Sequence, residues 1–260
     1  MAKARAATIL GPMSKTTPSA RAAALRSSLL VLAIPVLLGL AACADSPTEG
    51  ERLEGMPAAI NERFLDPELS IDPWVGRWEG ESREIFRYRH RIAEACGLGR
   101  GMAVADVGCG TGLFEKLFAD RVGPFGRVYA IDISLPFLKH VAEKAAKHGL
   151  TQIETRLGSQ RSIRLEPASV DLAFVCDVYH HFEDPPAILE SIRSAIRPGG
   201  RLVLVDFRRI PGLSSAFILE HCRAGQEVFR AEVERAGFIH EETPAVDGLK
   251  DNYLMQFRRP

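Results

Sequence analysis

The sequence predicts an α/β fold with a doubly wound sheet that is mostly parallel and ends in an antiparallel pair of strands. Short apolar segments alternate with segments whose apolar residues recur at helical spacing, which is typical of repeated strand–helix units. A glycine-rich turn at residues 108–112 separates the first such strand from the helix that follows it. A Pro-Gly-Gly turn at residues 198–200 precedes a late apolar strand.

The N-terminal segment has the features of an export signal. Residues 1–42 carry five basic residues and no acidic residue, and residues 29–40 form an apolar run of about a dozen residues. A run of this length is too short to cross a bilayer and matches the core of a signal peptide. The Leu-Ala-Ala-Cys sequence that ends at Cys43 resembles the bacterial lipobox, which implies cleavage before Cys43 and lipidation of that cysteine. Met13 would give a signal of more usual length than Met1.

These features predict a signal peptide over residues 1–42 and a protein of the bacterial cell envelope, attached to the membrane through lipidated Cys43. An uncleaved anchor or a chance apolar helix is the alternative, and the protein would be cytoplasmic if the signal is not used. Without residues 1–42 the chain has 28 basic against 33 acidic residues. This mildly acidic balance argues against a nucleic-acid partner.

Residues 43–78 are predicted to form a tether and an extended lead-in, since they are rich in Pro, Glu, Asp and Ser. Both tryptophans of the chain, Trp74 and Trp78, precede a helix predicted over residues 79–96. They either pack that helix onto the sheet, which is the commoner role for such side chains, or line the mouth of a pocket. The folded domain is expected over residues 79–260.

The first predicted strand, residues 103–107, runs into a turn that contains three alternating glycines. A helix over residues 113–122 follows, with apolar residues at helical spacing. Glycines at such a turn permit positive φ and allow a ligand to approach main-chain N–H groups at the helix start. The spacing differs from the dinucleotide pattern G-x-G-x-x-G, because Leu113 stands where the third glycine would be. An NAD-dependent oxidoreductase is therefore disfavoured.

The segment Asp106-Val-Gly-Cys-Gly-Thr-Gly112 resembles motif I of the class I S-adenosylmethionine (SAM)-dependent methyltransferases. The resemblance implies a Rossmann-like class I methyltransferase fold and SAM as the cofactor. It also implies that Asp106 lies near the amino group of the cofactor and that the main chain of the turn receives its methionine part. The turn residues concerned are Gly108, Cys109, Gly110 and Gly112.

The second predicted strand, residues 126–132, ends in Asp132, 20 residues beyond the last glycine of the turn. A carboxylate at this place accepts hydrogen bonds from the ribose hydroxyls of a bound nucleotide. The alternative is that Asp132 caps the helix predicted over residues 134–148, but Ser134 is able to cap that helix instead. Ile133 would offer an apolar face to adenine.

A third strand is predicted over residues 152–157 and is followed by Ser159 and Gln160. Methyltransferases of this class commonly have an acidic residue at the position of Ser159, which contacts the adenine amino group. That acid is absent here, so Ser159 or Gln160 would have to make the contact.

The fourth predicted strand, residues 169–177, ends at Asp177 and continues into Val-Tyr-His-His-Phe. This segment resembles the strand-four motif of the type 11 methyltransferase group, including the His-His-Phe. Because ligands bind at the carboxyl ends of parallel strands, we expect Asp177 at the cofactor and the histidines at the substrate. Tandem histidines are expected to point to different sides, so at most one of His180 and His181 would reach the substrate. A histidine that only bonds the loop main chain is the alternative.

The last segments complete the predicted sheet. A helix over residues 185–196 leads through Arg-Pro-Gly-Gly into a fifth strand that ends at Asp206. Another helix is predicted over residues 214–236. Glu220 and His221 are expected on its solvated face, and the alternative is that they lean toward the pocket. The terminal antiparallel pair is expected from residues 237–242 and 252–257.

The cysteines form no C-x-x-C pair. Cys109 and Cys176 are expected at the ends of adjacent strands, as buried free thiols rather than as a disulfide. His180 and His181 have no matching carboxylate or cysteine spacing for zinc, so no metal site is predicted.

Together these features predict transfer of a methyl group from SAM to an oxygen or nitrogen nucleophile. The acceptor would be an unidentified small molecule, a lipid or an exposed protein group, and His180, His181 or Asp206 would accept its proton. The alternative is a non-catalytic SAM-binding or structural envelope lipoprotein on the same fold, because SAM is made in the cytoplasm.

Overall fold

The computed structural model describes residues 53–260. The predicted signal peptide over residues 1–42 and the predicted lipidation site Cys43 lie outside the described residues. The start of the predicted tether lies outside them as well.

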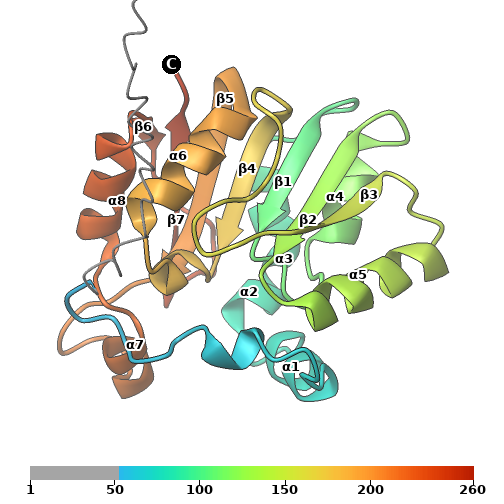
Figure 1. Ribbon diagram of the computed structural model, residues 1–260. Coiled ribbons are helices and arrows are strands. Elements are labelled where there is room, and N and C mark those ends of the chain that lie inside the picture. The colour runs from blue at the N-terminus through green and yellow to red at the C-terminus, as the bar shows by residue number, and fades with distance from the viewer. Residues whose placement is uncertain (1–52) are drawn as a thin grey trace, which may run out of the picture. The chain divides into compact units, whose positions relative to one another are not determined.

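A seven-stranded sheet forms the centre of the described chain (Figure 1). Its strands are β1 (Ala103–Val107), β2 (Arg127–Asp132), β3 (Ile153–Leu157), β4 (Val170–Cys176), β5 (Ile196–Phe207), β6 (Ile239–Glu242) and β7 (Asn252–Arg258). They lie in the order β3-β2-β1-β4-β5-β7-β6. The neighbours from β3 to β5 are parallel, and β7 is antiparallel to both β5 and β6. The predicted doubly wound sheet with a C-terminal antiparallel pair is confirmed.

Helices cover both faces of this sheet (Figure 1). They are η1 (Glu62–Phe64), α1 (Asp72–Trp78), α2 (Glu84–Arg87), α3 (Arg89–Ala95), α4 (Glu115–Val122), α5 (Leu135–Lys147), η2 (Tyr179–His181), α6 (Pro185–Ala195), α7 (Ala216–His221) and α8 (Gln226–Arg235). Side chains alternate between the faces of a strand. In β1, Val104 therefore packs in the apolar cluster of α3 and α4, and Ala105 packs in that of α6 and α8.

Two of the predicted helices are interrupted. The helix predicted over residues 79–96 is divided into α2 and α3, because Tyr88 leaves the helical conformation with φ −103° and ψ 13°. The Tyr88 ring packs so closely on Gly248 that an added Cβ there would lie 2.2 Å from it. The helix predicted over residues 214–236 is divided into α7 and α8, because Cys222 is extended, with φ −92° and ψ 124°. Both predictions of one continuous helix are therefore wrong.

The described part of the predicted lead-in, residues 53–78, forms η1 and α1 and packs against α5. The rings of Phe64 and Trp78 lie 6.1 and 5.3 Å from the ring of Phe137. Trp74 lies 4.9 Å from Trp78, ring centre to ring centre. These aromatic contacts attach the lead-in to the sheet domain at the side where β1 and β2 end.

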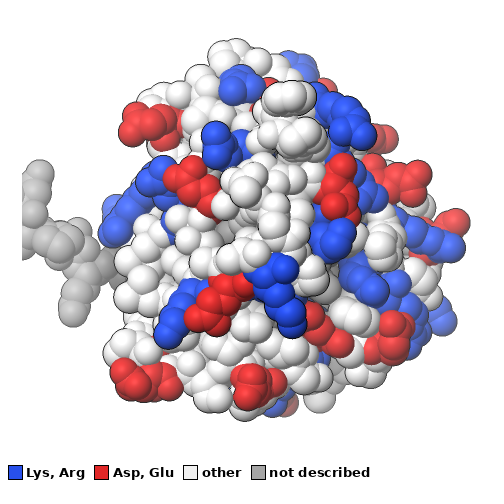
Figure 2. All heavy atoms as spheres, turned by 90° about the vertical axis from the view of Figure 1, so that its right-hand side faces the viewer, with Lys and Arg blue, Asp and Glu red and all other residues white. Residues whose placement is uncertain are grey.

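Figure 2 shows Lys and Arg side chains beside Asp and Glu side chains over the face that carries β3 and α5. Such a mixture permits local ion pairs, as between Lys116 and Asp120 of α4, 2.7 Å apart. Among residues 53–260, no helix combines the length and the apolar character needed to span a membrane.

Candidate active site

The glycine turn between β1 and α4 folds back onto the end of β2. All three of its glycines have positive φ, which is 78° at Gly108, 52° at Gly110 and 75° at Gly112. The N–H group of Gly108 donates to the carbonyl oxygen of Ile131 at 2.7 Å. An added Cβ at Gly108 would lie 2.5 Å from the side chain of Val178, which follows β4. The turn thus requires glycine both for its conformation and for its close packing.

Asp132, at the end of β2, holds this turn in place. Its Oδ2 accepts from the N–H of Gly110 and its Oδ1 from the N–H of Ser134, both at 2.9 Å. Because a carboxylate oxygen has two acceptor sites, each oxygen keeps one for a ligand. Burial raises the pKa of Asp132 to about 6, against the opposing effect of these two N–H donors. The capping bond expected from the side chain of Ser134 is not formed.

Two buried carboxyl groups lie together beside the turn. Asp106 of β1 and Glu115, the first residue of α4, are each only 3% exposed. Burial, followed by the neighbouring Glu115 carboxyl, raises the pKa of Asp106 well above its ordinary value. Burial also raises the pKa of Glu115 to about 7. Burial and mutual repulsion thus favour protonation of this pair over full ionisation.

A pocket at this edge of the sheet brings together nine of the ten predicted cofactor residues. They are Asp106, Gly108, Cys109, Gly110, Asp132, Ile133, Ser159, Gln160 and Asp177. Gly112 does not line the pocket, and its role is in packing, since an added Cβ there would lie 2.9 Å from Val141. Trp78 lines the pocket from α1 and lies over Gly110, where an added Cβ would approach its ring to 3.0 Å. Of the two roles considered for this tryptophan, the structure thus supports the pocket wall.

The carboxylate of Asp177 is fully engaged within the protein. Its Oδ2 accepts from Arg83 and its Oδ1 from Asn252, each at 2.6 Å. Burial raises the pKa of Asp177, and the Arg83 guanidinium opposes that rise. Asp177 therefore contributes a fixed ion pair to the pocket wall rather than a free carboxylate.

Residues 105–204 match a protein family described as a methyltransferase domain. The solved structure of a SAM-dependent methyltransferase from Aquifex aeolicus is similar, with a TM-score of 0.64 and 25% identity, and the match covers 73% of this chain and 99% of that one. The fold is that of a class I methyltransferase. The family match and the Aquifex aeolicus structure imply SAM as its cofactor.

Two curated proteins with methyltransferase names resemble this chain in sequence. Nocamycin O-methyltransferase from Saccharothrix syringae is 30% identical over 181 residues, which are 69% of this chain and 64% of that protein. Ubiquinone biosynthesis O-methyltransferase from Xanthomonas euvesicatoria pv. vesicatoria is 36% identical over 112 residues, which are 43% of this chain and 45% of that protein. The chain thus spans less than two thirds of either relative.

The pocket residues fit SAM. Asp132 lines the pocket and keeps acceptor sites free, as two ribose hydroxyls require. Ile133 and Phe137 give an apolar side for a purine ring, and Asp106 supplies a carboxyl group on the side of the glycine turn. Carboxyl groups beside the turn suit a ligand with a sulfonium and an ammonium group. Ser159, which stands where the acid was expected, and its neighbour Gln160 both line the pocket and offer polar atoms.

His180 and Asp206 form a buried pair next to this pocket. Nδ1 of His180 lies 2.8 Å from Oδ1 of Asp206, and these residues are 1% and 0% exposed. Asp206 also accepts from the main-chain N–H groups of His180 and Phe207, at 3.2 and 2.7 Å. A catalytic contribution from Asp206 would thus act through His180, since its carboxylate is enclosed.

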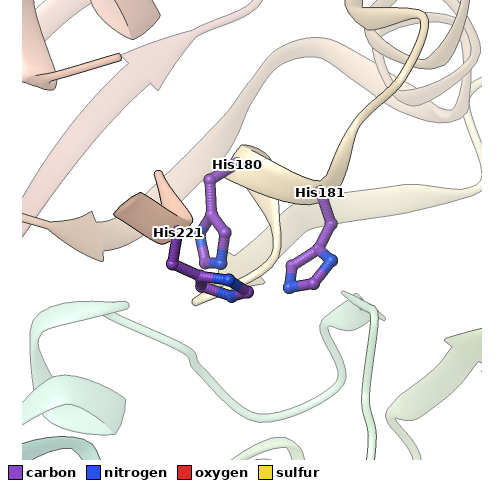
Figure 3. A group of neighbouring side chains, drawn as sticks. All are labelled: His180, His181 and His221. Atoms are coloured by element: carbon purple, nitrogen blue, oxygen red, sulfur yellow. The ribbon is translucent and has the colours of Figure 1, made fainter. Parts of the chain in front are cut away.

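The tandem histidines do not point to different sides. Their rings lie 4.5 Å apart, and the ring of His221 from α7 lies 4.9 Å from His180 and 5.2 Å from His181 (Figure 3). The prediction that His180 and His181 diverge is wrong, because η2 turns both rings toward α7. The solvated position expected for His221 is also wrong. Burial and nearby positive charge lower the pKa of His181 to about 2 and that of His221 to about 4.

A second cavity lies on the other side of the histidines. It is lined by all three rings and by aromatic side chains that include Trp74, Phe207 and Phe217. The two cavities share a wall formed by Phe64, Trp78, Arg83, Asp177 and His181.

The described cysteines are free thiols, as expected for Cys109 and Cys176. Burial raises the pKa of both thiols well above the ordinary value. Both thiols pack at the edge of the sheet and are not activated nucleophiles.

Several residues that build the site were not recognised from the sequence. They are Asn61, Phe64, Arg83, Glu115 and His221. Asn61 and Phe64 lie in the predicted lead-in, and His221 lies about 40 residues beyond the tandem histidines. Only Glu115 could have been recognised from the local sequence, because it is a carboxylate at the start of the first helix after the glycine turn.

Proposed function

We propose that this protein transfers the methyl group of SAM to an oxygen or nitrogen nucleophile of a small molecule, a lipid or an exposed protein group. Oxygen is the favoured acceptor, because both relatives described above are named O-methyltransferases. The alternative of a non-catalytic SAM-binding lipoprotein is less well supported, because Asp106, the three glycines of the turn and Asp132 are all retained.

The shared wall between the two cavities is the observation that supports the proposal most directly. Methyl transfer needs the donor and the nucleophile to be aligned on either side of one short gap, with water excluded. His181 and Trp78 line both cavities, so the two cavities adjoin at these side chains, and a ligand in one would lie close to a ligand in the other. A cofactor in the first cavity and an acceptor in the second would meet here.

The residues around the gap would bind and orient the reactants. SAM supplies a methyl group on a positively charged sulfur, so little further activation of the donor is needed. Asp132 and the glycine turn would hold the ribose and the methionine part, and the Asp106–Glu115 pair would balance positive charge. Trp78 would cover the turn and exclude water.

The acceptor side would be organised by the histidines. Nε2 of His180 is the ring nitrogen not bonded to Asp206, so it is available to a hydroxyl or amine of the acceptor. Asp206 would act as a positioning residue that fixes the ring. His181 would contact both reactants because it lies in the shared wall.

We further propose that the protein acts in the bacterial cell envelope, anchored through Cys43. The support is the N-terminal charge pattern and the Leu-Ala-Ala-Cys sequence. Metabolic labelling with a fatty-acid analogue, followed by Cys43→Ser, tests this: wild-type label that is lost in the variant supports the anchor, and unlabelled wild-type protein contradicts it.

The transfer itself is tested with SAM that is labelled in its methyl group. The full chain is incubated with phenols, amines and phospholipid vesicles as separate acceptor classes. We expect label in one class and an equal amount of the demethylated cofactor, with loss of both in Asp132→Ala. Binding of SAM without transfer to any class would contradict catalysis and support the non-catalytic alternative.

A further inference from the structure

Three histidine rings converge on the wall of the second cavity (Figure 3). His180 and His181 come from η2, and His221 comes from the end of α7. One ring nitrogen of each lies within 4.8 Å of the corresponding atoms of the other two. Convergence from two elements about 40 residues apart in sequence is not a consequence of local helix geometry.

The tautomer of His180 is fixed by its partner. Asp206 carries a carboxylate that also accepts two main-chain N–H groups, so Nδ1 of His180 donates its proton to Oδ1 at 2.8 Å. In the neutral imidazole with this tautomer, the free lone pair lies on the other nitrogen, Nε2. A carboxylate that orients a histidine in this way is the usual outer partner of a metal-binding imidazole.

The tautomer of His181 follows from Asn61. The amide nitrogen of Asn61 donates to the main-chain oxygen of His181 at 2.8 Å and to Oε1 of Glu183 at 2.9 Å. This orientation leaves Oδ1 of Asn61 facing Nδ1 of His181 at 3.1 Å, so Nδ1 is the donor. His181 therefore also has its lone pair on Nε2.

Two oriented lone pairs beside a third imidazole form a set of nitrogen ligands. Zn²⁺ and similar divalent ions bind imidazole nitrogen, and three protein ligands with one open position are typical of their reactive sites. Nitrogens bound tetrahedrally to Zn²⁺ at about 2.0–2.1 Å lie about 3.3 Å apart. The three nitrogens would thus draw together by up to about 1.5 Å, which side-chain rotation of the partly exposed His181 and His221 permits.

A second set of side chains competes for the same ion. Asp206, His180 and Cys222 also place ligand atoms within 4.8 Å of one another, but all three are buried. An ion there would displace the hydrogen bond that holds His180. The three-histidine set keeps that bond and opens to a cavity, so it is favoured.

We propose that His180, His181 and His221 bind a divalent transition-metal ion of the zinc type, with Asp206 and Asn61 as outer partners. The open fourth position would face the cavity that is lined by Arg63, Trp74 and Phe217. With the ion bound, an acceptor oxygen would bind the ion at this position in place of Nε2 of His180. Aromatic walls and a guanidinium beside the ion suit a phenolic oxygen. This acceptor assignment rests on the proposed function, whereas the metal site itself does not.

Metal binding is tested on the full chain after treatment with a chelator. Zn²⁺ alone is titrated by calorimetry, and Co²⁺ alone is titrated by visible absorption, which reports ligand number and type. We expect one ion per chain and a four-coordinate spectrum without thiolate bands. His221→Ala should weaken binding at least about tenfold, and Asp206→Asn about 10- to 100-fold.

Two matched controls make the result decisive. Cys222→Ser tests the competing set, and His148→Ala removes an exposed histidine on the far end of α5. Both should bind Zn²⁺ as the wild type does, while circular dichroism shows every variant folded. The proposal is overturned by a folded wild type that binds no ion, by His221→Ala that binds normally, or by loss of binding in either control.

The outcome for the metal site can be separated from that for the proposed function. Zn²⁺ binding is measured without SAM, and SAM binding is measured on chelator-treated protein. If Zn²⁺ binds and SAM does not, the metal site stands and the methyltransferase proposal fails. If SAM binds and Zn²⁺ does not, the proposed function stands and the metal site fails.

Discussion

Oδ1 of Asp206 lies 2.8 Å from Nδ1 of His180, and both side chains are enclosed in the protein. The same carboxylate accepts the main-chain N–H groups of His180 and Phe207. It thereby ties the end of β5 to η2 and fixes the ring of His180 beside those of His181 and His221. The proposed acceptor side of the site depends on this contact.

Asp206→Asn should lower turnover about tenfold or more, because an amide no longer fixes the tautomer of His180. SAM affinity should change little, since Asp206 does not line the cofactor pocket. Steady-state kinetics and calorimetry on the same preparation check this. Unchanged turnover would show that the His180–Asp206 pair is only structural.

Gly108→Ala should lower the free energy of unfolding by about 2–4 kcal/mol, from left-handed backbone strain plus overpacking against Val178. Gly149→Ala is the matched control, because Gly149 has φ 65° but no atom within 4 Å of an added Cβ. Gly149→Ala should lower the free energy of unfolding by only about 1 kcal/mol, which is the cost of the left-handed backbone strain alone. Chemical denaturation measures both, and equal losses would argue against tight packing of the turn.

Trp78→Ala and Trp74→Ala should distinguish the binding functions of the two cavities. Trp78 lines both, so its loss should weaken SAM binding and also raise the KM for the acceptor. Trp74 lines only the second of them, so its loss should raise the acceptor KM and leave SAM affinity nearly unchanged. Equal effects of both substitutions on SAM affinity would contradict the division into a cofactor cavity and an acceptor cavity.

SAM affinity should rise as the pH increases through about 6. Burial raises the pKa of Asp132 to about 6, so the folded protein holds that proton more tightly than the unfolded chain does. Ionisation of Asp132 therefore lowers the stability of the free protein between about pH 4 and pH 6, while it supplies the acceptor that ribose needs.

Calorimetric titrations from pH 5 to 8 measure this dependence. Asp132→Asn should bind SAM weakly, and its SAM affinity should no longer change near pH 6. Glu115→Gln should retain that change, because its own raised pKa belongs to the pair with Asp106. A pH profile that is the same in Asp132→Asn and wild type would assign the dependence to another group.

The fold was predictable because its signals are local. The glycine turn, the acid at the end of β2 and the Pro-Gly-Gly turn each fix a short segment, and parallel strands bring their carboxyl ends to one edge. The residues of the cofactor pocket could be predicted because they follow strands that end at this edge. Asp106, Asp132 and Gln160 therefore meet in one pocket.

The acceptor half was not predictable in the same way. Asn61 contacts His181 across 120 positions of sequence, and no periodicity carries such information. His221 was assigned to the solvated face of a long helix, but the break at Cys222 turns the end of α7 toward η2. Tertiary packing also accompanies the break between α2 and α3, where Tyr88 packs on Gly248.

The most direct test is calorimetric titration of SAM and of its demethylated product into the full chain, with Asp132→Ala, Gly110→Val and the Gly149→Ala control. We expect micromolar binding by the wild type and the control, and loss of binding in the two pocket variants while each stays folded. A well-folded wild type that binds neither ligand would contradict the assignment of this pocket to SAM.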